Sequence, residues 1–200
     1  MTLNSFFYFL EQANILSLAI DELLNVGVRV VSVTCDSPIV QLSMMKELGA
    51  NLDVNNPDLH ICKDKPGPKI HFIHDVCHAL KLVRNAWHKH KKIKNGDVID
   101  WTYIERLYEL QSREHLKCAN KLSCAHIFFQ NNKMKVKYAA QLLSRSVSLS
   151  LKYCRENLKL EQFQGSEATE QFLLIINDIF DLMNSRSEFS NNWYWMICTF

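Results

Sequence analysis

The sequence has few residues that interrupt helices, with only five glycines and four prolines among its 200 residues. Because glycine and proline mark turns and breaks, their scarcity favours a helix-rich chain with few tight turns. Hydrophobic residues make up 48% of the chain. This length and composition suffice to bury one hydrophobic core, or one domain and part of a second.

Cysteine pairs at metal-binding or redox spacing are absent as well. The seven cysteines are scattered and odd in number, which favours a reducing compartment with mostly buried thiols over a disulfide framework or a zinc finger. The amino-terminal apolar patch lacks a basic region and a cleavage site, and Glu11, Gln12 and Asp21 interrupt it. We therefore predict neither a signal peptide nor a membrane span.

Net charge is small, at +2, and does not by itself indicate a nucleic-acid partner. Its distribution is more informative, because every charged side chain from residue 81 to residue 94 is Lys or Arg. Such a run is typical of a solvated helix face and helix end, and the alternative is contact with an anion or a phosphate backbone. The candidates for DNA contact are Lys81, Arg84 and Lys91.

A β-branched run, VRVVSVTCDSP at residues 28–38, predicts a strand buried on both faces, as in a parallel or central strand. The strand ends in the carboxylate of Asp36. Ligands of open α/β sheets bind at the carboxyl ends of strands, so Asp36 is well placed to hold a cation. Alternatively, Asp36 or Ser37 caps the next helix, with Pro38 in its first turn.

The periodicity of apolar residues predicts the other elements of the first half. A helix at 6–26 leads into the β-branched strand through a short glycine turn, so its partner strand is expected upstream and the chain is expected to begin inside a domain. The remaining predictions are a helix at 39–48, a polar loop at 51–68, a strand at 69–74 and a helix at 75–92 that Asp75 caps.

The helix at 75–92 has an apolar side that includes Leu80, Val83 and Trp87. His78, Lys81, Arg84 and Asn85 fall on the adjoining side at spacings of three and four. His78 is interpreted as a packed, hydrogen-bonded histidine. The alternative is a metal ligand, for which the helix offers no partner four residues on.

After a turn at residues 95–97 the chain is predicted to be entirely helical, with helices at 101–115, 118–130, 133–157 and 169–183. Ser166, with Thr169 and Glu170 after it, supplies capping chemistry for the last helix. The change in composition at Asn95 marks the predicted domain boundary.

Seven blocks, in this order, resemble the catalytic region of P-element-like transposases, including the THAP-domain transposases of animals. The resemblance spans about residues 15–186, through VSVTCDSP, MMKELGANL, HDVCHALKLVRNAW, GDVIDWTYIERLYELQ, ANKLSCAHI, KMKVKYAAQLLSRSVSLSL and FQGSEATEQFLLIINDIFDLMNSR. It implies an α/β, mostly helical fold: a partial RNase H-like domain over residues 1–95, then an all-α insertion domain over 96–186 that binds guanine nucleotide. Residues 187–200 depart from the family, as an appended tail or an apolar plug.

The family's activity is DNA transposition by three carboxylates that hold Mg²⁺. Paired metals activate an attacking water or 3′-hydroxyl and stabilise the phosphate in the transition state. The resemblance maps the second catalytic Asp onto Asp36 and leaves Asp75 as a nearby helix cap. Ser37 and Gln41 stand where family members often have Gly and Asn. The other two carboxylates of the family fall upstream of this chain and beyond Phe200, so we expect no DNA cleavage by this chain alone.

A GxxxxGK[ST] phosphate loop is absent, so the nucleotide prediction depends on the resemblance. Such a site needs cations for the phosphates and a carboxylate or amide for the guanine base. The candidates for the phosphates are Lys121, Lys133, Lys135 and Ser144, and those for the base are Asp181 and Asn184. For each of them the alternative is a solvated helix residue.

The resemblance also implies Mg²⁺ and GTP as cofactors, DNA and other transposase subunits as partners, and a nuclear location. The sequence itself carries no clear import signal. An alternative function is a folded interaction or DNA-binding module that pairs with a full-length, transposase-like partner. Half of an RNase H sheet would leave a bare edge at the strand that starts at Val28.

Overall fold

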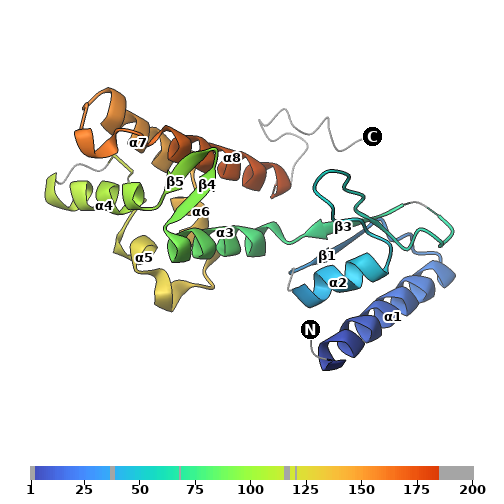
Figure 1. Ribbon diagram of the computed structural model, residues 1–200. Helices are drawn as coiled ribbons and strands as arrows, with labels where there is room; N and C mark the ends of the chain where they lie inside the picture. The colour runs from blue at the N-terminus through green and yellow to red at the C-terminus, as the bar shows by residue number, and fades with distance from the viewer. Residues whose placement is uncertain (1–2, 37–38, 68, 115–117, 120, 185–200) are drawn as a thin grey trace. The chain divides into compact units, whose positions relative to one another are not determined.

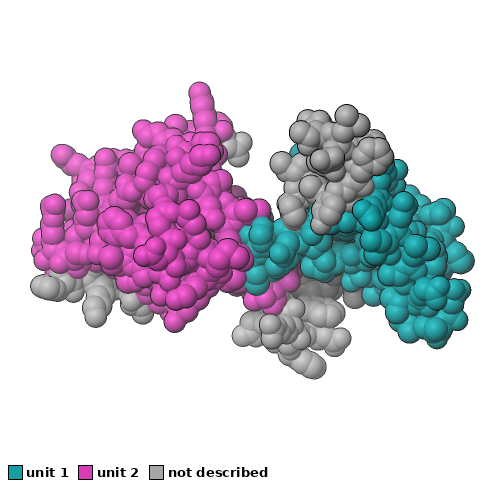
Figure 2. Space-filling model, turned by 90° about the horizontal axis from the view of Figure 1, so that it is seen from below, with its two compact units in different colours: residues 1–79 teal, residues 80–200 magenta. Residues whose placement is uncertain are grey.

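The computed structural model describes residues 3–36, 39–67, 69–114, 118–119 and 121–184 (Figure 1). The chain divides into two compact units, Met1–Ala79 and Leu80–Phe200 (Figure 2). The division falls inside helix α3 (Val76–His90), upstream of residue 95, where the composition changes. Within the described residues, no helix is both long and apolar enough to cross a membrane.

The first unit combines two helices with a small mixed sheet. Its elements are α1 (Leu3–Asn25), β1 (Ser32–Cys35), α2 (Ile39–Glu47), β2 (His60–Ile61) and β3 (Ile70–His74). The sheet has the order β1-β3-β2, in which β1 runs parallel to β3 and β2 antiparallel to it. The predicted helices and strands are confirmed, and β2 is a short addition inside the expected loop.

The core of this unit lies between the helices and one face of the sheet. Helices α1 and α2 pack against each other (Figure 1). In β3, Ile70 and Phe72 are buried while His71 and Ile73 are exposed, the alternation of a strand that is covered on one face. Buried side chains from the helices complete the core: Phe9, Ala13, Ile20, Met44 and Met45.

The prediction that the β-branched strand is buried on both faces is wrong. In β1, Ser32 and Thr34 are exposed, and Val33 and Cys35 are only half-buried. The cause is that one face of the sheet is left uncovered by the described elements: Ser32 and Thr34 lie beside the exposed His71 and Ile73 of β3 on that face. Among the described residues no strand pairs with the outer side of β1, as expected of a partial sheet.

The second unit is mostly helical. After the end of α3 it contains β4 (Lys92–Asn95), β5 (Asp97–Asp100), α4 (Thr102–Glu114), α5 (Cys124–Ile127), η1 (Phe129–Asn132), α6 (Val136–Leu142), α7 (Arg145–Glu156), η2 (Glu161–Phe163) and α8 (Glu167–Met183). Its core includes fully buried aromatic and aliphatic side chains from α3, α4, η1, α6, α7, η2 and α8 and from the residue before α4: Trp87, Trp101, Ile104, Leu107, Phe129, Leu142, Leu151, Phe163 and Leu173.

An antiparallel hairpin, β4–β5, replaces the expected helix end and the purely helical continuation. The turn at residues 95–97 is confirmed, but the strands on either side of it were not expected. Helix α3 stops because Lys91 adopts a left-handed backbone with φ 60°, and its N–H donates to the carbonyl of Trp87. A left-handed residue after the last helical turn is a common way to end a helix.

The long helix expected at 133–157 is instead two helices. Ser144 lies between α6 and α7 and caps α7, with its Oγ 3.5 Å from the backbone N of Val147. The helix expected at 118–130 is likewise reduced to the short α5 and η1. Ser166 does not cap α8 with its side chain: its hydroxyl is buried and donates to Glu170 Oε1 at 2.6 Å.

Candidate functional site

Asp36 lies directly after β1, and its side chain is 64% exposed. Because β1 and β3 are parallel, both strands end at one edge of the sheet, and Asp75 N–H donates to the carbonyl of Cys35 there. Asp75 accepts the N–H of Cys77 at 2.9 Å and so caps α3 as expected. One turn into α3, the Nδ1 of His78 lies 3.9 Å from Asp36 Oδ2.

This edge does not by itself form a magnesium site. Magnesium prefers six oxygen ligands in octahedral geometry and is usually held by more than one carboxylate or by substrate phosphates. Among the described residues no three His, Cys, Asp or Glu side chains lie close enough to hold a metal ion. Asp36 is therefore an exposed carboxylate at the end of a strand, and the described residues around it do not form a cluster of metal ligands with it.

Two of the nucleotide candidates belong to one polar cluster between α7 and α8, which pack side by side (Figure 1). Ser144 caps α7, and the next residue, Arg145, donates its N–H to Asn177 Oδ1 at 3.2 Å. Asn177 donates in turn to Asp181 Oδ2 at 2.9 Å, and Asp178 pairs with the Arg145 guanidinium at 2.9 Å. We call these five residues the α7–α8 polar cluster.

The other nucleotide candidates lie outside this cluster. Asn184 is one turn beyond Asp181, at the C-cap of α8. Lys121 is exposed in the turn before α5. Lys135 is exposed at the N-cap of α6, with its Nζ 5.9 Å from the ring centroid of Tyr138. Within the described part of the chain, no interaction joins either lysine to the α7–α8 polar cluster.

The three DNA candidates have different surroundings. Lys81 is half-buried, and the Lys91 ammonium donates to Glu105 Oε1 at 2.7 Å. Arg84 is fully buried, so it does not belong to the solvated helix face predicted for it. The spacing of the buried residues explains the error. Leu80, Arg84 and Trp87 follow one another at intervals of four and three residues, so they lie on the same buried side of α3.

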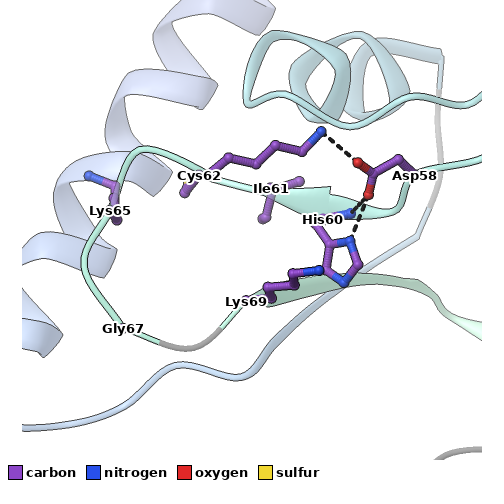
Figure 3. A pocket seen from close by; sticks show the side chains of 8 residues that line it. Asp58, His60, Ile61, Cys62, Lys65, Gly67 and Lys69 are labelled. Carbon is purple, nitrogen blue, oxygen red and sulfur yellow. Dashed lines mark hydrogen bonds and ion pairs between the residues drawn. The ribbon is translucent and has the colours of Figure 1, made fainter. Parts of the chain in front are cut away.

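A pocket of about 280 Å³ in the first unit was not anticipated from the sequence (Figure 3). Asp58 pairs there with Lys63 at 2.8 Å and with His60 Nδ1 at 2.6 Å, and these contacts hold the pKa of the Asp58 carboxyl well below its usual range. Lys65, also in the pocket lining, pairs with Asp21. Carboxylates therefore neutralise Lys63 and Lys65, and of the three lysines in the lining Lys69 alone has no ion pair within the described residues.

Two segments of the chain match models of known protein families. Residues 77–195 match a family model described as "TNP-like, GTP-binding insertion domain", and residues 5–49 match "TNP-like, RNase H N-terminal domain". The human protein "DNA transposase THAP9" is 33% identical over 181 residues, which cover 88% of this chain and 20% of that protein. The Drosophila melanogaster "Transposable element P transposase" is 31% identical over 124 residues, covering 62% of this chain and 16% of that protein.

A solved structure supports the same assignment. The chain is similar to one in the "Drosophila P element transposase strand transfer complex", with a TM-score of 0.74 and 26% identity over 88% of this chain and 39% of the other. The chain thus spans about a fifth of the length of the human relative. Since one family model covers more than half of the chain, the protein belongs to the P-element-like transposases, and it carries the family's RNase H N-terminal region and GTP-binding insertion domain.

Proposed function

We propose that this chain acts as part of a P-element-like transposase in which the helical unit binds guanine nucleotide. The observation that carries the proposal is the α7–α8 polar cluster, which joins Ser144 and Asp181 through Arg145 and Asn177. The family model that covers this unit is named for GTP binding, which supports the same assignment.

The chemistry of the cluster suits a guanine nucleotide. The guanine base offers two neighbouring N–H donors, at N1 and N2, and the exposed Asp181 carboxylate is an acceptor of matching geometry. The phosphates need cations and N–H donors, which Arg145 and the amino-terminal turn of α7 offer at the other end of the cluster. Lys121, Lys135 and Asn184 are the further ligands that we propose from the family resemblance.

For catalysis we propose that Asp36 is one of the carboxylates that hold Mg²⁺ in the assembled transposase. Its exposure and its position at the carboxyl end of β1 support this role. One carboxylate does not hold two metal ions in the geometry needed for phosphoryl transfer, so we expect no strand cleavage by this chain alone. DNA, other transposase subunits and a nuclear location are the partners and the setting that this role implies.

Titration with a fluorescent GTP analogue and magnesium tests the nucleotide proposal. We expect saturable binding that GTP abolishes and ATP does not. Asp181→Ala is expected to weaken binding about tenfold or more, because the base donors lose a charged acceptor. Lys121→Ala is also expected to weaken GTP binding, because the nucleotide phosphates lose a cation.

Lys152→Ala and Glu109→Ala serve as matched controls, because both side chains are exposed on helices outside the α7–α8 polar cluster. They are expected to bind GTP as the unaltered chain does. If a chain that unfolds cooperatively shows no saturable GTP binding, the nucleotide proposal fails. The interaction module, which the edge position of β1 in the described sheet supports, is then the better hypothesis.

A further inference from the structure

A second pocket, of about 450 Å³, lies within the helical unit, and Lys133 is the one nucleotide candidate in its lining. The end of α3, the residue that follows it and the region of η1 line it, through Asn85, His88, Lys89, Lys91, Phe129, Gln130 and Lys133. We call it the α3–η1 pocket. Its lining includes three lysines and no carboxylate, so it is chemically suited to an anion.

The positive charge of the α3–η1 pocket is only partly neutralised. Glu105 pairs with Lys91. Lys89 and Lys133 are both exposed, and neither forms an ion pair with a carboxylate of the described residues. In the pocket of Figure 3, by contrast, Asp58 and Asp21 pair with two of the three lysines, Lys63 and Lys65.

A buried guanidinium adds a further positive charge behind the pocket wall. Arg84 contacts three residues of the pocket lining: it donates to Asn85 Oδ1 at 3.0 and 3.1 Å and to the Lys133 carbonyl at 2.7 Å, and it lies 4.1 Å from the ring centroid of Phe129. Its Nη1 is buried and has no hydrogen-bond partner among the described residues, and none of their carboxylates pairs with it.

Such a charge is costly unless an anion balances it. Isolated buried ions are rare because desolvation costs several kcal/mol, and buried charges are usually paired. The environment of His88, which also lines the pocket, reflects this positive charge: burial lowers the pKa of His88, and Lys91, Arg84 and Lys133 lower it further, against an opposing effect of Glu105. Glu105 balances Lys91, and Arg84, Lys89 and Lys133 have no carboxylate partner among the described residues.

We propose that the α3–η1 pocket binds a phosphate group of a nucleic-acid backbone. Lysine ammonium groups bind phosphate as point charges, and amides such as Asn85 and Gln130 add hydrogen bonds to its oxygens. The exposed Lys94 of the adjacent hairpin extends positive charge beyond the pocket, as a polyanion would need.

A backbone phosphate fits the α3–η1 pocket better than a free nucleotide does. Phe129 is 1% exposed and Arg84 covers its ring, so the pocket provides no aromatic face on which a base can stack. The identification of DNA as the source of the phosphate rests on the proposed transposase function. It does not depend on nucleotide binding at the α7–α8 polar cluster.

Fluorescence anisotropy with short labelled duplex and single-stranded oligonucleotides, measured over a range of salt concentrations, tests the proposal. The informative variant is Lys89→Gln with Lys133→Gln. The matched control is Lys152→Gln with Lys159→Gln, which removes the same charge from two exposed lysines outside the pocket. We expect the pocket variant to lose about tenfold or more in affinity. We also expect the slope of log K against log salt to fall by about 1 to 2 for duplex DNA.

Three results would overturn the proposal. Equal losses of DNA affinity in the pocket variant and the control would show that DNA is attracted to the whole surface and not to the pocket. An unaltered chain that does not bind DNA would exclude the DNA backbone as the source of the phosphate. Competition by inorganic phosphate or GTP as strong as that by unlabelled DNA would assign the pocket to a free phosphate. Unchanged urea unfolding of the variant establishes that it is folded. Unchanged GTP titration of the single variant Lys89→Gln, which leaves the phosphate candidate Lys133 in place, separates this test from that of the proposed function.

Discussion

Replacing Trp101 with alanine is expected to remove about 3–5 kcal/mol from the free energy of unfolding of the helical unit. Trp101 is fully buried, and its ring contacts Trp87 and His88 edge-to-face at centroid distances of 5.0 and 5.1 Å. Its Nε1 donates to Glu105 Oε1 at 3.0 Å. Truncation leaves a cavity between α3 and α4 and removes a hydrogen bond, and both losses destabilise the same core.

Urea unfolding followed by circular dichroism measures this effect, because the substitution itself removes a fluorophore. Phe128→Ala is the control, since Phe128 is 68% exposed and its loss is expected to change the free energy of unfolding by no more than about 0.5 kcal/mol. A Trp101→Ala chain that unfolds at the same urea concentration as the control would contradict the packing described for this core.

Glu170→Ala is expected to cost the helical unit about 3 kcal/mol, the lower end of the range for removing one member of a buried ion pair. Glu170 is 6% exposed, and Arg155 binds its two carboxylate oxygens through Nε and Nη2, both at 2.9 Å. The cost is at the lower end because Arg155 keeps Glu156 and Glu167 as partners.

The same carboxylate makes the unit sensitive to acid. Burial acts to raise the pKa of Glu170, but hydrogen bonds from Arg155 and Ser166 outweigh it and hold the pKa below the ordinary value of 4.5. A lowered pKa in the folded state contributes stability that is complete above 4.5 and is lost as the pH falls through the lowered value.

Comparison of the unaltered chain with Glu170→Gln at neutral and acidic pH isolates this contribution. We expect the difference in free energy of unfolding to be largest near neutral pH and to shrink below about pH 4. A difference that is constant with pH would mean that the pair stabilises the fold by packing and not by charge.

The elements predicted correctly are those in which local pattern and tertiary position agree. Helix α8 has apolar residues at helical spacing, acidic residues in its first turn and a glycine before it, and the structure retains it from Glu167 to Met183. Asp75 caps α3 as expected, because a cap is a contact between neighbours in the sequence.

The errors arise where distant parts of the chain decide the outcome. The residues of β4 contain Lys92 and Lys94, which are typical of a helix end, and only the pairing with β5 makes them a strand. The burial of β1 depends on which faces of the sheet other elements cover, which the run of valines does not specify.

The same limit applies to the candidate sites. The position of Asp36 after a strand was predictable because a strand end is a local feature, and its role as a metal ligand stays a prediction from the resemblance. The α3–η1 pocket was not predictable, because it depends on Lys133 coming close to residues of α3 that lie far from it in the sequence. The buried stripe of α3 did carry a signal for Arg84, which shares the spacing of Leu80 and Trp87.

The distribution of thiols gives each unit its own chemical reporter of opening. Among the described cysteines, Cys62 in the first unit and Cys154 in the second are buried, whereas Cys124 is exposed. Burial raises the pKa of both buried thiols, that of Cys154 to about 11, so the reactive thiolate is scarce until the surrounding structure opens. Alkylation followed by peptide mass spectrometry would therefore time the opening of the two units separately in one sample, with Cys124 as the internal standard for full exposure.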